Sequence, residues 1–494
     1  MKSQLKILMV FPEVAPFATT GLVGEVGCAL PKALKDMGHD VRVITPQYRS
    51  VNERKYILRD VIRLQNISVP LGDEVVQINV KSAFLPDSKV QVYFIDYKPF
   101  FFRDGLYCDA KKSKAYPDND KRFILFSKGV IETLLKLQWQ PDVIHCYDWP
   151  SGMLPFLMRY VYHDNVFFNK THSLFSTYQL DHLGLFNADC YHWTSINENF
   201  QFKDSGLDYQ GQCSFLKAGI VYSEVVSTSG DLWSNHNNSA DQGIQHIHTI
   251  YKKPKKSISH VVNGVDYKGW DPLTDACISE NYDIHSLSKK EENKRILLEK
   301  VNLPYSKRRP VVGFAFQSKN ENSLRLLKEE IEPIMALDVT VVIVADSDKG
   351  LRTFFKELQN RYVDRLSVVL LEDVSLLHLL EAGSDLRLIP NTANADSHES
   401  IYCLKYGTVP ILMRSQDGRG PVTPFDIKTG KGMGFFYDAF VSGDLVACLQ
   451  KAVDTFADRK TWLKIMKNGM REDFSWHEAA KKYVQLYQRC MMAK

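Results

Sequence analysis

The sequence contains no pair of cysteines at the spacing typical of a zinc site or a redox motif. Its nine cysteines are spread singly from Cys28 to Cys490, and no two are separated by only two residues. An odd, scattered set fits neither a disulfide framework nor a zinc site. His246 and His248 lie close together, but no third ligand accompanies them. We therefore expect free thiols, a reducing compartment, no metal and no cofactor.

The chain also lacks a strong excess of charge and any long apolar run. Its 62 Lys and Arg residues nearly balance 58 Asp and Glu residues, for a formal net charge of +4. Such a balance does not favour nucleic acid or an anionic membrane as a partner. No apolar run has the roughly 20 residues of a membrane span, and the apolar segment after Met1 is too short for a signal peptide. We expect a cytoplasmic protein.

The first 45 residues have the pattern of a nucleotide-binding unit. An apolar run over 8–11 leads through a small-residue loop with Gly21 and Gly24 into a helical pattern over 25–37, and a second apolar run covers 41–45. This order predicts strand, loop, helix and strand. In such a unit the loop lies at the carboxyl end of the sheet, where a helix N-terminus favours anions. The glycine spacing alone is a weak signal of such a site and is more typical of a mere tight turn.

Two polar residues follow short apolar runs and are candidate site residues. Asp148 follows a run over 142–146, and His172 follows a run over 167–169. In an open parallel sheet, residues just beyond the strand ends point into the ligand crevice. Asp148 is equally compatible with a helix cap, and His172 with an ordinary loop histidine.

A second series of alternating strands and helices begins at Val311 and predicts a second doubly wound domain. With 494 residues, the chain is long enough for two domains. We predict an N-terminal Rossmann-like domain over 1–262, a second over 263–474, and a closing helix over 475–494 that begins with a capping box at Ser475 and Glu478. The predicted fold is α/β, with two Rossmann-like domains facing a central cleft that holds the ligand.

Several local stretches, in order along the whole chain, resemble bacterial glycogen synthases and plant starch synthases. These are retaining GT-B enzymes that move glucose from ADP-glucose to the end of an α-1,4-glucan. The resemblance implies the GT-B fold, an α-glucan such as glycogen as partner, and ADP-glucose as donor. The stretches that carry it are 11–18 (FPEVAPFA), 29–34 (ALPKAL), 143–149 (VIHCYDW), 214–220 (SFLKAGI), 262–266 (VNGVD) with Trp270, 405–410 (KYGTVP) and 474–480 (FSWHEAA).

The resemblance also identifies site residues, some of which depart from the family pattern. Four positions match residues expected near the donor sugar: Asp148, His172, Asn263 and Tyr402. Glu25 replaces an acid of the first loop, an Asp in the family. In the first loop the family has a Lys and a Gly-Gly pair, where this chain has Thr19 and Gly21-Leu22. In the second domain the family has an Arg and a Lys, where this chain has Gln317 and Asn322. The functional Glu of the family is Asn394 here.

These departures affect the groups that would stabilise a departing nucleotide. Glucosyl transfer builds negative charge on the diphosphate, and preorganised cations must stabilise it. Losing one such group typically costs about 100-fold to 1000-fold in rate, and losing three should cost on the order of 10⁴ or more. Four other residues are candidates for compensation: Lys319, Arg325, Arg419 and Glu399. For Glu399, helical spacing favours a place at the start of the helix that begins near Ser397 over the carboxylate role.

The sequence supports three functional hypotheses. The first is a weakly active or inactive homologue of glycogen synthase that binds glucan or an active synthase partner. The second is an active synthase that uses ADP-glucose or UDP-glucose. The third is a GT-B transferase with another donor. We favour the first because the expected cations and the Glu are replaced together.

Overall fold

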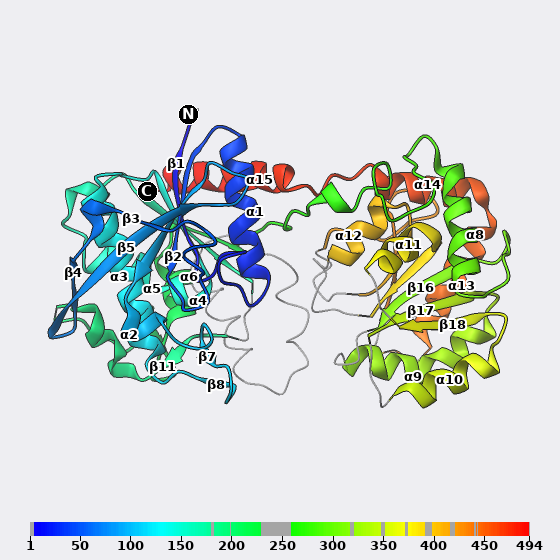
Figure 1. Ribbon diagram of the computed structural model, residues 1–494, viewed down its shortest axis with the longest axis horizontal. Helices are drawn as coiled ribbons and strands as arrows, with labels where there is room; N and C mark the ends of the chain where they lie inside the picture. The colour runs from blue at the N-terminus through cyan, green and yellow to red at the C-terminus, as the bar shows by residue number, and fades with distance from the viewer. Residues whose placement is uncertain are drawn as a thin grey trace. The chain divides into compact units, whose positions relative to one another are not determined.

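The computed structural model describes residues 4–178, 182–197, 199–228, 258–316, 321–346, 351–370, 374–390, 398–414, 420–438, 441 and 443–493. The chain divides into two units, each built of β-sheet and helices (Figure 1). Unit 1 comprises Met1–Leu232, Asn238–Gly264 and Trp476–Lys494. Unit 2 comprises Trp233–Asn237 and Val265–Ser475.

The main sheet of unit 1 has the strand order β15-β14-β10-β9-β1-β2-β6-β5-β3, and β4 pairs with β5. The strands from β15 to β6 are parallel, whereas β5 runs antiparallel to its neighbours. The strands are β1 (Lys6–Val10), β2 (Asp40–Pro46), β3 (Arg59–Asp60), β4 (Ile67–Leu71), β5 (Glu74–Phe84), β6 (Gln91–Asp96), β9 (Val143–Tyr147), β10 (His172–Thr177), β14 (Val225–Thr228) and β15 (Ile258–His260). Smaller pairings join β7 (Cys108–Asp109) to β8 (Lys114–Ala115), and β13 (Gln212–Ser214) to β11 (Leu185–Phe186) and β12 (Asp208–Tyr209).

Helices cover both faces of this sheet. The chain moves in opposite directions from β1 to β2 and from β9 to β10, so right-handed crossovers place α1 and α5 on opposite faces. The C-terminal helix α15 packs on α1 and on β9, β10 and β14 (Figure 1). The helices are α1 (Leu22–Asp36), α2 (Lys98–Phe101), α3 (Asn119–Leu137), α4 (Asp148–Ser151), α5 (Met153–Tyr160), α6 (Phe215–Tyr222) and α15 (Trp476–Met492), with 3₁₀ turns η1 (Ile62–Leu64), η2 (Val166–Phe168) and η3 (Ala188–Thr194).

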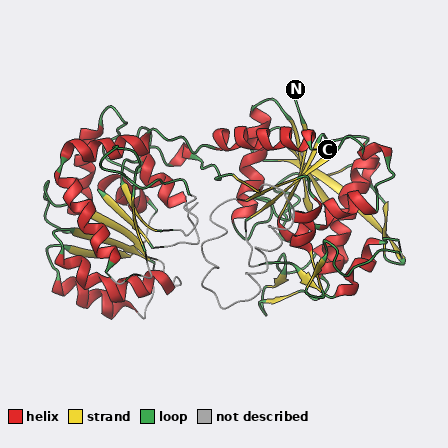
Figure 2. Cartoon of the chain, turned by 180° about the vertical axis from the view of Figure 1, so that it is seen from behind, coloured by secondary structure: helices red, strands yellow, loops and turns green. Residues whose placement is uncertain are grey.

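Unit 2 has one parallel sheet in the order β18-β17-β16-β19-β20-β21. Figure 2 shows helices around each of the two main sheets. The strands are β16 (Val311–Phe316), β17 (Thr340–Ala345), β18 (Leu366–Leu370), β19 (Leu386–Ile389), β20 (Val409–Met413) and β21 (Phe435–Tyr437). The helices are α8 (Lys290–Lys300), α9 (Glu321–Ala336), α10 (Arg352–Arg361), α11 (Ser375–Gly383), α12 (His398–Lys405), α13 (Asp444–Ala457) and α14 (Arg459–Met470), with η4 (Tyr267–Gly269) and η5 (Leu287–Lys289).

These elements follow from the hydrophobic pattern. Strand β17 is buried along its whole length, as expected for a central strand covered on both faces. The alternation of strands and helices predicted from Val311 onward is confirmed, as is the α/β class. Within the described residues, no helix combines the length and the apolar character that a membrane span needs.

Unit 2 contains a buried lysine at the start of α8. Lys290 is 5% exposed, and its Nζ donates to the carbonyls of Glu381 (3.0 Å) and Ala382 (2.8 Å) and to Thr408 Oγ1 (2.8 Å). Burial lowers the pKa of Lys290 from 10.5 to about 8. The folded chain therefore releases this proton at a lower pH than the unfolded chain does.

We expect this lysine to make stability depend on pH. Between its folded pKa of about 8 and its unfolded value of 10.5, the unfolded chain holds more protons, so rising pH stabilises the fold. Urea unfolding should show that Lys290→Met costs at least about 1 kcal/mol more near pH 10 than near pH 7.5. Lys289→Met, which removes an exposed lysine from the preceding position, is the matched control for the loss of a lysine side chain. An equal cost of Lys290→Met at both would contradict the lowered pKa.

Candidate functional site

The loop between β1 and α1 occupies the carboxyl end of the sheet in unit 1. It turns back on itself, with the Val14 amide donating to the Ala18 carbonyl (2.8 Å) and the Ala15 amide donating to the Gly24 carbonyl (2.9 Å). A Cβ on Gly24 would lie 2.2 Å from Thr19 Oγ1, so only glycine fits there. The predicted strand, loop and helix are confirmed.

Thr19 and Gly21, which stand where the family has a Lys and the first residue of a Gly-Gly pair, are both exposed. Thr19 Oγ1 donates to the Gly21 carbonyl (3.1 Å), so its hydroxyl is engaged within the loop. Gly21 precedes the first turn of α1 with extended backbone, and an added Cβ would contact nothing within 4 Å. Glu25 is exposed in that first turn. A negative charge is favourable at a helix N-terminus, and here Glu25 supplies it.

A buried carboxylate that the sequence analysis missed lies in the same loop. Glu13 is 3% exposed and accepts hydrogen bonds from the amide and the hydroxyl of Thr20, both at 2.7 Å. Burial raises the pKa of Glu13, and the bonds from Thr20 oppose that rise. Glu13 stands two residues after the apolar run over 8–11. A place just after an apolar run is the criterion that identified Asp148, and it could have identified Glu13 as well.

Asp148 lies directly after β9, at the carboxyl end of the sheet, as predicted. It is 7% exposed, has a φ of 52°, and its Oδ1 accepts a hydrogen bond from the Tyr178 amide (2.9 Å). Aspartate tolerates the left-handed region better than most residues, and such conformations concentrate at functional sites. Tyr178 follows the last residue of β10, so this bond joins the ends of two neighbouring strands.

The predicted position of His172 is wrong. Residues 166–168 form the 3₁₀ turn η2 rather than a strand, and His172 begins β10 instead of following a strand. It pairs with Val143, the first residue of β9, so it lies at the amino edge of the sheet. With a rise of about 3.3 Å per residue, the length of a strand separates it from Asp148. Tyr178 occupies the place after β10 that His172 was expected to take.

A buried polar network extends from the carboxyl half of the sheet to α15. His145 Nδ1 lies 2.9 Å from the hydroxyls of Tyr147 and Tyr487, and its Nε2 lies 2.6 Å from Ser176 Oγ, which contacts Ser227 Oγ. Burial lowers the pKa of His145 well below its ordinary value, so the ring is neutral. Because Tyr487 belongs to α15, this network helps to hold the C-terminal helix on unit 1.

Asn263 and Tyr402, which the resemblance identified, belong to different units. Asn263 follows β15 in unit 1 and is 3% exposed, and neither Nδ2 nor Oδ1 has a hydrogen-bond partner among the described residues. Tyr402 lies on α12 in unit 2, where its ring stacks on Trp270 with centroids 4.6 Å apart. The Trp270 ring also stacks on the His378 ring, with centroids 3.7 Å apart.

Most of the remaining candidates lie outside the described residues. These are Gln317, Lys319, Asn394 and Arg419, together with the pair His246 and His248. Asn322 and Arg325 lie in α9, of which only the backbone is described at these positions.

Glu399 stands in the first turn of α12, the position that helical spacing favours. In the same unit, Arg387 is 2% exposed and its Nε lies 2.8 Å from Glu381 Oε1. Burial opposes the charge of Arg387, but the carboxylates of Glu381 and Glu399 outweigh it and raise the pKa of Arg387. Glu399 thus takes part in a charge cluster around Arg387.

Asp275, Cys277 and His378 are the one group of described residues whose ligand atoms lie close enough to hold a metal. The Asp275 carboxylate already accepts bonds from the Cys277 amide (2.8 Å), the Tyr406 hydroxyl and the His378 ring (2.9 Å). These bonds satisfy the buried carboxylate without an ion. We interpret the group as a hydrogen-bonded support beneath Trp270.

Comparison with known proteins places this architecture in a family. The family described as the starch synthase catalytic domain matches residues 6–231. The chain is 31% identical to the glycogen synthase of Chlorobaculum parvum over 98% of its length and 99% of the relative's. It is also 31% identical to the glycogen synthase of Desulforudis audaxviator, over 99% and 97%.

Solved structures support the GT-B fold. The catalytic domain of starch synthase IV from Arabidopsis thaliana, bound to ADP and acarbose, matches with a TM-score of 0.72 and 23% identity over 99% of this chain and 100% of that one. A glycosyltransferase from Rickettsia africae matches with a TM-score of 0.53 and 14% identity over the full length of both. At these identities the likeness concerns the fold alone. The full-length identity with curated relatives carries the assignment: the chain belongs to the glycogen synthase family.

Proposed function

We propose that this protein works in α-1,4-glucan metabolism as a glucan-binding member of its family whose donor-phosphate site is degraded. It then has little or no glucosyltransferase activity. The observation that carries the proposal is the chemistry of the loop between β1 and α1, which contains an acid and no basic residue over 11–24.

Glucosyl transfer from a nucleotide sugar requires positive groups where the diphosphate departs. A loop and helix N-terminus at the carboxyl end of a parallel sheet normally favour an anion. Here Thr19, which stands where the family has a Lys, is neutral, and its hydroxyl is bonded to the Gly21 carbonyl.

Arg122, a buried cation of unit 1, is committed to other partners. Arg122 is fully buried, and its three nitrogens donate to the Phe100 carbonyl (2.8 Å), Asn119 Oδ1 (2.5 Å) and the Leu106 carbonyl (3.0 Å). Moving it toward a phosphate would leave these acceptors unpaired, which typically costs about 1–3 kcal/mol each. Arg122 is therefore a poor substitute for the missing lysine.

The groups suited to sugar hydroxyls are better preserved. Asp148 presents a buried carboxylate at the end of β9, and the amide of Asn263 has no hydrogen-bond partner among the described residues. Carboxylates and amides are the side chains that can satisfy several hydroxyl groups at once. The starch synthase IV structure is bound to both ADP and acarbose. We propose that this chain retains the carbohydrate function, acts alone or beside an active synthase, and is cytoplasmic.

Calorimetry on the full chain tests the proposed glucan binding and the proposed loss of nucleotide binding separately. Maltoheptaose should give saturable heat, whereas ADP should give none up to millimolar concentration. The glycogen synthase of Chlorobaculum parvum, titrated in the same buffer, is the control. Incubation with ADP-glucose or UDP-glucose and glycogen should release no nucleotide above a blank without protein.

The alternative is an active synthase that compensates with other residues. Micromolar ADP binding together with nucleotide release at the rate of the Chlorobaculum parvum enzyme would establish it and overturn the degraded site. Absence of maltoheptaose binding would instead overturn the glucan half of the proposal.

A further inference from the structure

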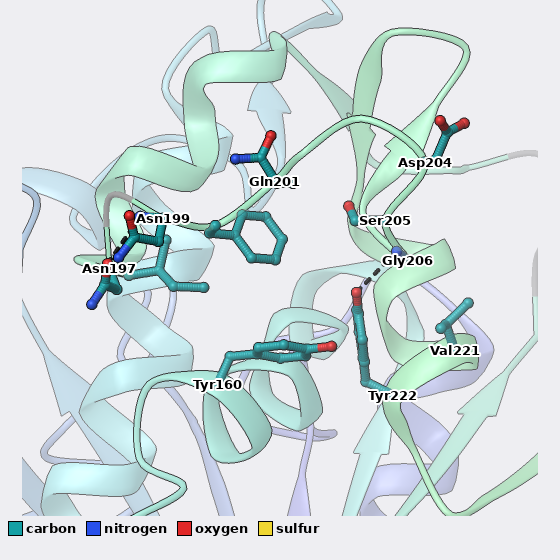
Figure 3. A pocket seen from close by; sticks show the side chains of 11 residues that line it. Tyr160, Asn197, Asn199, Gln201, Asp204, Ser205, Gly206, Val221 and Tyr222 are labelled. Carbon is teal, nitrogen blue, oxygen red and sulfur yellow. Dashed lines mark hydrogen bonds between the residues drawn. The ribbon is translucent and has the colours of Figure 1, made fainter.

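Unit 1 contains a pocket of about 660 Å³ that the proposed function does not use (Figure 3). Its walls come from Tyr160 at the end of α5, from loop residues within 196–197 and 199–206, and from Tyr222 at the end of α6. The volume lies within the range of about 300–1000 Å³ that is common for small-molecule sites.

This pocket lies at the opposite end of the sheet from Asp148. Helix α5 starts after the carboxyl end of β9 and runs back, so its last residue, Tyr160, lies toward the amino edge. Tyr222 precedes the first residue of β14 by only three positions, which places it at the same amino edge. The pocket is therefore separate from the candidate site at the carboxyl edge.

Three aromatic rings form one side of the pocket. Tyr160 stands edge-on to Tyr222 at 5.3 Å and 81°, and edge-on to Phe200 at 5.8 Å and 74°. Phe156 is fully buried and contacts all three rings at 5.1–5.4 Å between centroids, which holds them in place. Tyr160 nevertheless remains 41% exposed. The Tyr160 ring is therefore held in place while part of the side chain stays accessible to a ligand.

Tyr222 is held by the backbone of the facing loop. The Gly206 amide donates to the Tyr222 hydroxyl (2.9 Å), and a Cβ on Gly206 would lie 2.6 Å from the ring. The loop therefore needs glycine at this point to approach the ring. Figure 3 shows Tyr222 and Tyr160 facing the loop residues across the pocket.

The loop side of the pocket is polar but almost uncharged. Asn197, Asn199 and Gln201 are exposed amides, and Asp204 is the one charged side chain among the described lining residues. No lysine, arginine or histidine belongs to that described lining. Such walls disfavour a phosphorylated or otherwise anionic ligand. They offer donors and acceptors for hydroxyl groups opposite flat apolar rings.

A pyranose ring has this combination of properties, with apolar C–H faces and a rim of hydroxyl groups. We propose that this pocket is a second carbohydrate site that binds a short stretch of α-1,4-glucan, with a sugar ring against Tyr160 and hydroxyl groups bonded to Asn197, Asn199 and Gln201. That the bound sugar is an α-1,4-glucan, and not another carbohydrate, rests on the proposed function. The site would hold a polysaccharide by a surface remote from the candidate catalytic end.

The test uses the full chain and measures retardation by glycogen in native gels. Tyr160→Leu keeps an apolar side chain but removes the flat ring, and it should weaken retardation by about threefold to tenfold. Combined Asn199→Ala and Gln201→Ala should weaken it by a similar factor. Tyr305→Leu is the matched control, because Tyr305 is 42% exposed and lies in unit 2. Thermal unfolding of each variant should match the wild type.

Hydroxyl-radical footprinting provides a second measurement that does not depend on a variant. Maltoheptaose should protect Tyr160 and Phe200 from oxidation and leave Tyr305 unprotected. Glycogen retardation that is unchanged in Tyr160→Leu, with no protection of Tyr160, would overturn the second site alone. Wild type that is neither retarded nor protected would overturn both proposals. Retardation lost in Tyr160→Leu, in a chain that releases ADP at a synthase rate, would support the second site and overturn the degraded donor site.

Discussion

Combining Thr19→Lys, Gln317→Arg, Asn322→Lys and Asn394→Glu is expected to raise nucleotide release from ADP-glucose by on the order of 10³-fold or more. Each change restores the charged residue that the family resemblance implies at that position. Three added cations would stabilise the charge that grows on the departing diphosphate. The effect should be strongly non-additive, because the groups act on one transition state.

The measurement is ADP release in the presence of glycogen, with each variant first shown to unfold at the same temperature as the wild type. A neutral set of similar size, Thr19→Met, Gln317→Met, Asn322→Met and Asn394→Gln, is the matched control and should gain nothing. A folded charged variant no faster than this neutral set would contradict the assignment of these four positions to the donor site.

Arg387→Met is expected to lower the free energy of unfolding of unit 2 by about 3–5 kcal/mol. The guanidinium is 2% exposed and lies against Glu381, which is 4% exposed and also accepts a bond from Cys403 Sγ (3.2 Å). Removing the arginine leaves a buried carboxylate without its cation. That cost exceeds the modest net value of the intact pair.

Urea unfolding followed by hydrogen exchange in peptides from β16 and β19 would assign the loss to unit 2. Arg361→Met is the matched control, because the pair of Arg361 and Glu332 is more than half exposed and should contribute less than about 1 kcal/mol. Arg387→Met together with Glu381→Met should recover most of the lost stability. If Arg387→Met costs no more than Arg361→Met, the pair is not the buried cluster described.

The elements that the sequence predicted correctly are those with strong local patterns. The apolar run over 8–11 gave β1 at Lys6–Val10, and the run over 142–146 gave β9 with Asp148 directly after it. These strands lie in the interior of a parallel sheet, where all their positions except Lys6 are buried and most of their residues are apolar.

The error at His172 has a physical cause. Val166, Phe167 and Phe168 form a run too short to distinguish a strand from a 3₁₀ turn by periodicity. The real strand β10 has a mixed sequence, HSLFST, because Ser173 and Ser176 bond to other side chains inside the core. A strand whose buried residues are polar and hydrogen-bonded to one another has no hydrophobic pattern from which it could be predicted. Because β10 begins at His172 instead of ending before it, His172 lies at the amino edge of the sheet and not at the carboxyl edge.

The sequence by itself determined the family and the α/β alternation, because each depends on residue identity or on neighbours a few positions apart. That the neutral residues Thr19, Gln317 and Asn322 leave the donor site without its cations stays a prediction. The tertiary structure decided which residues share an edge of the sheet, that Glu13 is buried behind the first loop, and that Tyr160, Phe200 and Tyr222 enclose one pocket. It also joined His145 to Tyr487, 342 positions later. Contacts of that kind depend on strand order and helix direction, which only the packed chain specifies.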